Sequence, residues 1–211
     1  MIKQSATRLP RHIATGRLRY WAASGLLVVL VVGSPVVAGA DTQSTTISSA
    51  IGSVISLFTT DSTVNVNVAP TGAGAQTIAS DTVTVSTNDS SGYTLVLGET
   101  GAGTSLVSGG NTIPHSSGTQ ASPVAMSVNT WGYRVDGIGG FGSGPTSGAS
   151  SQAIGSVKFA AVPATGSPNT LKTTSGVAAS DTTTVWYATA ADTTQATGTY
   201  TNNVTYTVTA N

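Results

Sequence analysis

The sequence predicts an all-β protein whose main part is a single antiparallel β-sandwich. Several stretches alternate strictly between apolar and small polar side chains, and Thr, Ser, Gly and Val dominate the composition after the first forty residues. Alternation with a period of two places one face of a strand toward a core and the other toward water. No window repeats apolar residues at the three-to-four spacing of an amphipathic helix. Residues 51–211 are therefore expected to form one β-sandwich domain.

The first forty residues have the pattern of an export signal. Five of the eight Lys and Arg residues precede residue 20, namely Lys3, Arg8, Arg11, Arg17 and Arg19. An apolar stretch follows at 26–32, and the small residues Ala38 and Ala40 fit a signal peptidase cleft. Residues 1–40 are thus expected to be a signal peptide cleaved after Ala40, with 41–50 as a leading segment. The mature protein is then secreted and acts outside the cell.

An uncleaved membrane anchor is the alternative for the same segment. A helix that spans the hydrocarbon needs roughly 20 apolar residues. Here the apolar run is short and is interrupted by Gly33, Ser34 and Pro35. The pattern favours the cleaved signal, and no membrane contact is expected once cleavage has occurred.

The charge of the mature chain limits its partners. Three basic residues (Arg134, Lys158, Lys172) and all eight acidic residues follow Ala40, so the formal charge there is −5. A surface with so few cations cannot neutralise a run of phosphates, which argues against nucleic acid and anionic lipid as partners. The chain has no cysteine, which excludes disulfides and thiolate metal sites.

Alternating segments predict about eight strands. Val64, Val66 and Val68 alternate with polar residues, as do Val83 and Val85. In the last segment the even-numbered residues from Tyr200 to Ala210 share one face, opposite threonines and Asn203. The candidate strands are 51–58, 62–68, 81–87, 92–97, 123–135, 153–162, 182–190 and 199–209. Polar turns between them, such as 88–92, suggest an immunoglobulin-like or jelly-roll-like sandwich.

Two Gly- and Ser-rich stretches do not fit this scheme of strands. Residues 98–118 and 137–151 contain few core-forming side chains and are expected to be long surface loops. Long loops on a rigid sandwich often carry binding function. Flexible spacing is the other explanation, and it is the commoner one.

Catalytic and metal-binding patterns are weak throughout the mature chain. His115 is its single histidine, and no Gly-x-Ser-x-Gly element marks a serine as nucleophile. One histidine and no cysteine do not supply the three or four ligands that zinc needs. The match of 137–142 to a dinucleotide-binding glycine pattern lacks a following helix and a ribose-binding acid. No catalytic residue, metal site or cofactor is therefore expected.

Aromatic residues cluster in two places and suggest a family. The segments Trp131-Gly132-Tyr133 and Tyr200-x-x-x-Val204-Thr205-Tyr206-Thr207-Val208 resemble the two elements of bacterial surface proteins that carry a WxL domain. The resemblance implies an exported β-rich domain held non-covalently on the cell wall. It makes Trp131, Tyr133, Tyr200 and Tyr206 the candidate ligand-binding residues, which would stack on sugar rings. The same rings could instead be core and corner residues of a sandwich.

Together these features predict a secreted, non-enzymatic cell-surface protein that is retained on the envelope. Its expected partner is a cell-wall polymer or glycan, or another surface protein. A self-assembling pilus-like or coat subunit is the alternative, because the last strand resembles that of spore-coat-U-type and pilus subunits and an edge strand at the C-terminus can pair with a neighbour. A secreted hydrolase that uses His115 is the third possibility.

Overall fold

The computed structural model describes residues 43–101 and 103–211 and divides the chain into two units, 1–48 and 49–211. The predicted signal peptide lies outside the described residues. Of the first unit, residues 43–48 are described and form no helix or strand. The described part of the chain contains no helix, and hence none that could cross a membrane. The second unit is built from β-strands, which confirms the predicted fold class.

The described residues form twelve strands rather than about eight. They are β1 (Ile55–Thr59), β2 (Ala75–Thr87), β3 (Tyr93–Glu99), β4 (Leu106–Ser108), β5 (Asn111–Ile113), β6 (Val124–Ala125), β7 (Thr130–Val135), β8 (Ala149–Ala153), β9 (Lys158–Phe159), β10 (Asn169–Thr173), β11 (Ala178–Ala191) and β12 (Val204–Ala210).

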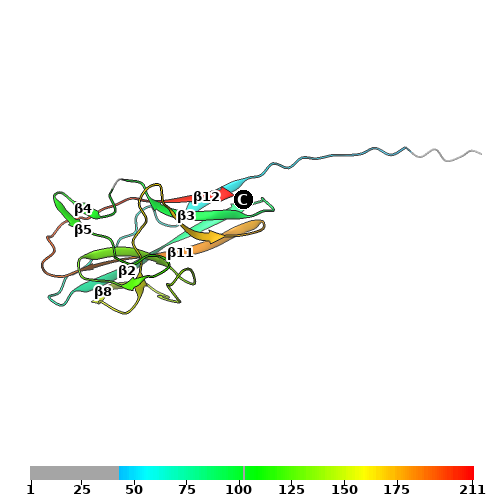
Figure 1. Ribbon diagram of the computed structural model, residues 1–211. Coiled ribbons are helices and arrows are strands. Elements are labelled where there is room, and N and C mark those ends of the chain that lie inside the picture. Colours follow the sequence, from blue (N-terminus) through cyan, green and yellow to red (C-terminus); the bar gives the residue numbers. More distant parts are fainter. Residues whose placement is uncertain (1–42, 102) are drawn as a thin grey trace, which may run out of the picture. The chain divides into compact units, whose positions relative to one another are not determined.

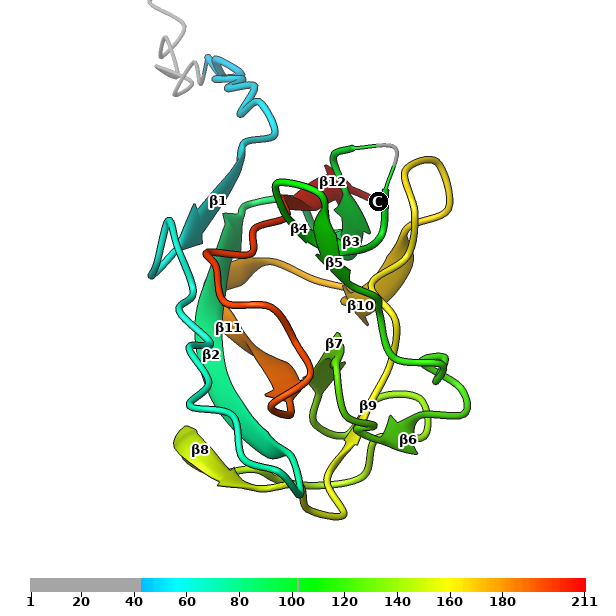
Figure 2. The ribbon, with the colours of Figure 1, turned by 90° about the vertical axis from the view of Figure 1, so that its left-hand side faces the viewer.

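Two antiparallel sheets make the sandwich (Figure 1). The larger sheet has the order β1-β2-β11-β7, and β8 also pairs with β2. The smaller sheet has the order β10-β3-β12. The long strands β2 and β11 pair along their length, from Ala178 opposite Thr87 to Ala191 opposite Ala75. Figure 2, turned by 90°, shows β2 and β11 side by side, with β3 and β12 forming a separate pair.

The main core lies between the two sheets. Its centre consists of side chains that are wholly buried, from β2 (Val83, Val85), β3 (Leu95, Leu97) and β11 (Val185). Val83 and Val85 are separated by one residue that faces the other way, and so are Leu95 and Leu97, as alternation requires. The predicted face of the last strand is confirmed, because even-numbered residues of β12 are partly buried and odd-numbered ones are exposed.

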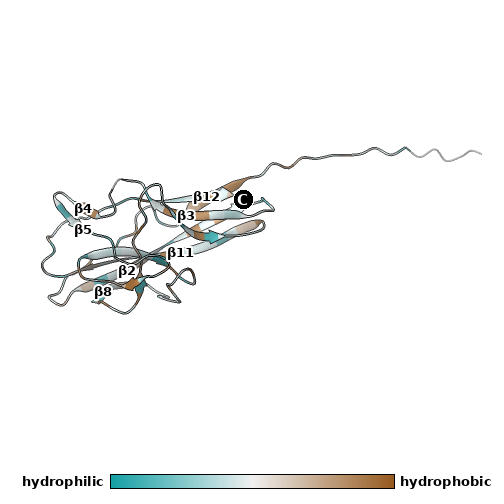
Figure 3. Cartoon of the chain, viewed as in Figure 1, coloured by the Kyte–Doolittle hydropathy of each residue, from teal (hydrophilic) through white to brown (hydrophobic). Residues whose placement is uncertain are grey.

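A second apolar cluster covers the other face of the larger sheet. Trp186, Ala188 and Ala190 of β11 pack there with Met126 and Phe159. The first half of β2 is consequently buried on both faces and shows no alternation. For this reason the sequence predicted only 81–87 of that strand. The apolar residues appear in Figure 3 as brown bands interspersed with pale and teal ones along the strands.

The prediction of a strand at 62–68 was wrong. The side chains alternate as expected, because Val64 and Val66 pack against the core while Asn65 and Asn67 are exposed. The backbone, however, forms no ladder with a neighbouring strand; contacts such as the hydrogen bond from Thr77 Oγ1 to Asn67 O (2.6 Å) hold it instead. Alternation reports burial of one face, and strand pairing is a separate condition.

The two expected surface loops are also more structured than predicted. Residues 98–118 contain the hairpin β4–β5, whose turn places Gly109 at φ 58°, a conformation that glycine adopts readily. Leu106 and Ile113 of this hairpin are buried in the main core. In 137–151, Phe141 is buried beside Tyr133 with ring centroids 5.6 Å apart, and β8 begins at Ala149. These segments close the sandwich rather than extend from it.

A candidate binding seam at the open edge of the sandwich

A hollow of about 320 Å³ lies where β1 and the chain that follows it meet β12. We call this hollow and its walls the seam. Its lining combines apolar, hydroxyl and acidic side chains: Leu57, Thr59, Asp61, Ser62, Val64, Asp81, Val204, Thr205 and Tyr206. These residues come from three separate parts of the chain, so the seam exists only in the folded domain.

The seam is open because both strands that border it are edge strands. β1 pairs only with β2, and β12 pairs only with β3, among the described residues. On β3 the inward-facing Tyr93, Leu95 and Leu97 are 0% exposed, whereas the inward-facing residues of β12 remain partly exposed. An edge strand offers unpaired N–H and C=O groups that can accept another strand. The seam therefore combines partly exposed apolar side chains with free backbone groups.

Polar groups from both sheets meet below the seam. The hydroxyl groups of Tyr206 and Tyr187 lie 2.8 Å apart. Burial raises the pKa of both phenols, and the neighbouring Asp81 carboxylate adds to this shift. Asp81 is 3% exposed and accepts a hydrogen bond from the backbone N–H of Asp61 at 3.2 Å. The two phenols stay protonated at neutral pH and act as hydrogen-bonding groups rather than charges.

Two of the four aromatic residues singled out by the sequence are inside the protein. Trp131 is 4% exposed and donates its indole N–H to the carbonyl of Thr104 at 2.9 Å. Tyr133 is 0% exposed, and burial raises the pKa of its phenol to about 12. Neither ring presents a face on which a sugar could stack. Their burial favours the alternative given above, that they are core residues.

The other two aromatic residues are partly exposed. Tyr200 donates its hydroxyl to the carbonyl of Ala196 at 2.7 Å and accepts a hydrogen bond from Gln195, so its polar end is held by the loop before it. Tyr206 lines the seam. Of the four candidates, only Tyr206 belongs to that lining. No shared shelf of all four rings is formed.

His115 lies beside a buried carboxyl group rather than a nucleophile. Its Nδ1 is 2.7 Å from the carbonyl oxygen of Ser116, so that nitrogen carries a proton and donates it. Glu99 is 4% exposed, and burial raises the pKa of its carboxyl to about 7, against the lowering effects of His115 and Asn202. Within residues 43–101 and 103–211 no hydrogen bond joins His115 to a serine hydroxyl. The triad geometry of a serine hydrolase is not assembled in this part of the chain.

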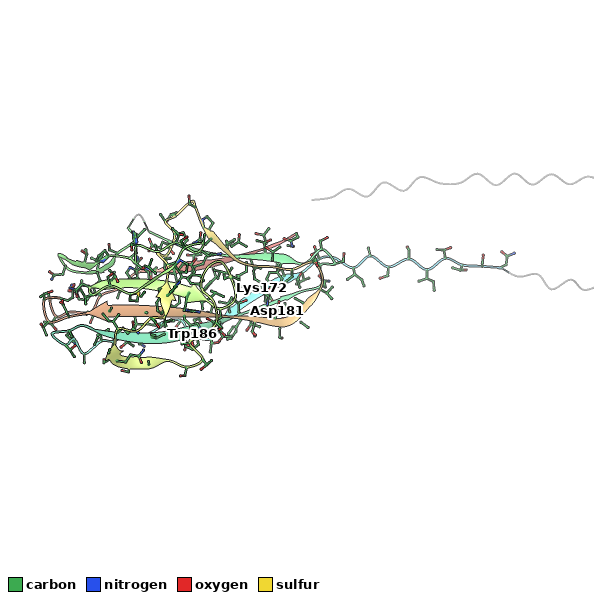
Figure 4. The ribbon with its side chains drawn as sticks, turned by 60° about the horizontal axis from the view of Figure 1, so that its bottom comes forward. Lys172, Asp181 and Trp186 are labelled. Carbon is green, nitrogen blue, oxygen red and sulfur yellow. The ribbon has the colours of Figure 1, made fainter. Side chains whose placement is uncertain are left out.

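A charged pair, Lys172 and Asp181, links the two sheets near the turn between β10 and β11 (Figure 4). Lys172 Nζ lies 2.5 Å from Asp181 Oδ1, and Tyr93 donates its hydroxyl to Asp181 Oδ2 at 2.8 Å. Burial acts to raise the pKa of Asp181, but the hydrogen bonds from Lys172 and Tyr93 outweigh it and lower the pKa. Trp186, also labelled in Figure 4, is buried in the second apolar cluster.

Metal-ligating side chains do not gather in the described part of the chain. No three His, Asp or Glu side chains there lie close enough together to hold an ion. A second hollow of about 370 Å³ has a mixed lining of polar side chains, such as Asn65 and Thr77, and apolar ones, such as Ile78 and Ala149. It lacks the bordering pair of free strand edges that distinguishes the seam.

Fold and site together define an antiparallel β-sandwich in which the hollow is bordered by two edge strands, β1 and β12. No known protein family, no curated protein and no solved structure matches the chain. Sequence reasoning placed Tyr206 on the inner face of the last strand but missed the seam itself. The seam depends on the meeting of residues 57–64, Asp81 and 204–206, and no local pattern signals that meeting.

Proposed function

We propose that this chain is a secreted, non-enzymatic protein of the cell surface that binds a polypeptide partner along its open seam. The leader pattern in residues 1–40 supports export, and the acidic surface of the mature chain argues against nucleic acid and anionic lipid as partners. The seam is the observation that carries the binding role, because it offers apolar side chains and unpaired backbone on adjoining edge strands.

Of the two partner classes expected from the sequence, the geometry supports another surface protein better than a wall polymer. Recognition of a glycan by stacking needs exposed ring faces, and Trp131 and Tyr133 are buried. An extended polypeptide instead needs hydrogen-bonding strand edges and small apolar pockets for alternate side chains. The seam offers both, with Leu57 and Val204 among its apolar walls.

Retention of the protein on its own cells tests this proposal. Leu57→Asp puts a charge into the seam at a residue that is 36% exposed, and Val177→Asp makes the same kind of change at an exposed residue (69%) that does not line it. We expect the wild type and Val177→Asp to remain on intact cells, accessible to added protease, and Leu57→Asp to be released to the medium. Circular dichroism verifies that both variants are folded.

Two results would contradict the proposal. A chain found in the cytosol with residues 1–40 still attached would exclude a surface role. Equal retention of Leu57→Asp and the wild type would exclude the seam as the binding surface. Sedimentation of both proteins with purified peptidoglycan would then favour the wall-polymer alternative.

A further inference from the structure

The segment 44–54, which we call the N-terminal tail, has the pattern of a strand but no partner strand. Ile47 and Ile51 have odd numbers, as do Ile55 and Leu57 of β1, so an extended chain would place all four on one face. The sequence predicted a strand from residue 51, yet β1 begins only at Ile55. Ile47 is 91% and Ile51 85% exposed. Ile47 and Ile51 are thus large apolar side chains that stand in water.

The composition of the tail also favours pairing with another chain. It has no charged residue and no proline, and it has one glycine, Gly52. Exposed segments that combine β-branched residues with an absence of charge and proline tend to add to free strand edges. From Ser44 to Ile51 the backbone makes no hydrogen bond to the described residues. Its donors and acceptors are therefore free for a partner.

The seam has the apolar surface and the unpaired strand edge that a tail of this kind could bind. Its apolar walls include Leu57, Val64 and Val204, and β12 provides an unpaired edge. An apolar cavity of about 150 Å³ is large enough for benzene, so a hollow of about 320 Å³ has room for about two aliphatic side chains. Tail and seam are thus complementary in chemistry, because the tail presents two exposed apolar side chains and the seam has apolar walls.

The tail cannot easily reach the seam of its own domain. The backbone just before β1 is held by Asn88, whose Oδ1 accepts from Val54 N–H at 2.7 Å and whose Nδ2 donates to Gly52 O at 2.9 Å. Val54 O also accepts from Thr87 Oγ1 at 2.9 Å. To turn back along β1, the chain would have to reverse direction at these residues and break those bonds. A second copy meets no such constraint.

We propose that the N-terminal tail of one copy binds in the seam of a second copy, with Ile47 and Ile51 in the hollow and the tail backbone along the free edge of β12. This inference rests on the proposed function and names its polypeptide partner as another molecule of the same chain. The contact is heterologous, because tail and seam are different surfaces, and it yields either an open chain of subunits or a pair that exchanges tails.

Disulfide trapping tests the inference, since the protein has no cysteine of its own. One preparation carries Ile51→Cys and a second carries Leu57→Cys; both are the exported chain, and they are mixed and oxidised. A disulfide needs Cα atoms within about 7 Å of each other, whereas residues 51 and 57 of one extended chain are about 20 Å apart. We expect a covalent heterodimer on non-reducing gels. Ala50→Cys, on the opposite face of the tail, is the matched control and should give at least tenfold less.

The double variant Ile51→Cys/Leu57→Cys separates the possible occupants. Disulfide-linked dimers or longer oligomers support the second copy. A monomer closed by an internal disulfide would show that the tail occupies its own seam. The absence of any disulfide between positions 51 and 57 in both experiments would show that the tail is not in the seam. Either result overturns the inference. Protease accessibility on intact cells, measured on the same variants, reports on the proposed function separately. A surface-exposed chain without cross-links would refute self-association and leave the surface role standing.

Discussion

The hydroxyl groups of Tyr187 and Tyr206 lie 2.8 Å apart and join the two sheets of the sandwich. Tyr187 belongs to β11 of the larger sheet and Tyr206 to β12 of the smaller one. Sheets in a sandwich ordinarily meet through apolar side chains. A hydrogen bond between them fixes how far the edge strand β12 stands from the larger sheet, and so it fixes the depth of the seam.

Removal of the Tyr206 hydroxyl should therefore destabilise the domain. In Tyr206→Phe the buried hydroxyl of Tyr187, a residue that is 5% exposed, loses its partner. An unsatisfied buried hydroxyl costs about 1–3 kcal/mol, and we expect the free energy of unfolding in urea to fall by that amount. Tyr187→Phe/Tyr206→Phe should lose less than the sum of the two single variants. Strict additivity would show that the two hydroxyls do not stabilise each other.

The buried carboxyl of Glu99 should make the stability of the protein depend on pH. Its pKa in the folded state is raised from the ordinary value of 4.5 to about 7, chiefly by burial. The folded protein therefore binds more protons than the unfolded chain between these values. The contribution of Glu99 to stability is fully present below pH 4.5 and is lost as the pH rises to 7, with a slope of at most about 1.4 kcal/mol per pH unit.

Glu99→Gln isolates this effect, because glutamine keeps the size of the side chain but does not titrate. Urea unfolding at pH 5 and pH 8 should show a loss of stability in the wild type that is smaller in Glu99→Gln. All other titratable groups are the same in the two proteins, so the difference between them reports Glu99. Identical pH dependence in the two proteins would mean that the carboxyl is solvated and titrates normally.

The interaction between Lys172 and Asp181 should remain an ion pair and not become a covalent cross-link. The two side chains are 33% and 29% exposed, and the lowered pKa of Asp181 keeps its carboxyl group ionised at neutral pH. Amide formation would need a neutral amine and a neutral acid. The intact mass of the purified protein should show no loss of water or of ammonia. A deficit of either would establish a cross-link and contradict the prediction.

The sequence correctly predicted strands that have one solvent-exposed face. It failed for a strand segment that is buried on both faces and for a segment whose backbone does not pair with a neighbour. Alternation located β3, most of β11 and the inward face of β12. It missed β10, which is short, and the first half of β2, which is buried on both faces. It also predicted a strand at 62–68, where the valines point inward but the backbone has no ladder. The hydrophobic pattern of a segment indicates which side chains are buried, whereas the pairing of its backbone with another strand depends on the whole fold.

The candidate site could be predicted only in part for a related reason. The four candidates were aromatic residues, which are few in this chain. Two of them, Trp131 and Tyr133, lie in the core and not on a binding surface. Tyr206 lies at the seam, but Leu57 and Asp81 lie far from it in sequence and become its neighbours only because the two sheets pack face to face. A binding surface formed by two edge strands has no local signature, whereas the tail that precedes β1 in sequence does.

Asn202 should hold the loop formed by residues 100, 101 and 103–105 against the end of the sandwich. Its Nδ2 lies 3.1 Å from Glu99 Oε1, Gly103 O and Ser105 O, so one side-chain amide connects the loop to the buried carboxyl. The same loop supplies Thr104 O, which accepts a hydrogen bond from the indole N–H of Trp131.

In Asn202→Ala we expect the free energy of unfolding to fall by about 1–3 kcal/mol. We also expect the Trp131 indole N–H to exchange its hydrogen at least tenfold faster, as measured by NMR. Asn203→Ala is the control. Asn203 contacts this loop through its backbone, whose carbonyl oxygen accepts a hydrogen bond from Thr100 N–H, so the substitution leaves that contact in place. Equal indole exchange in the two variants would show that the loop is held without the Asn202 amide.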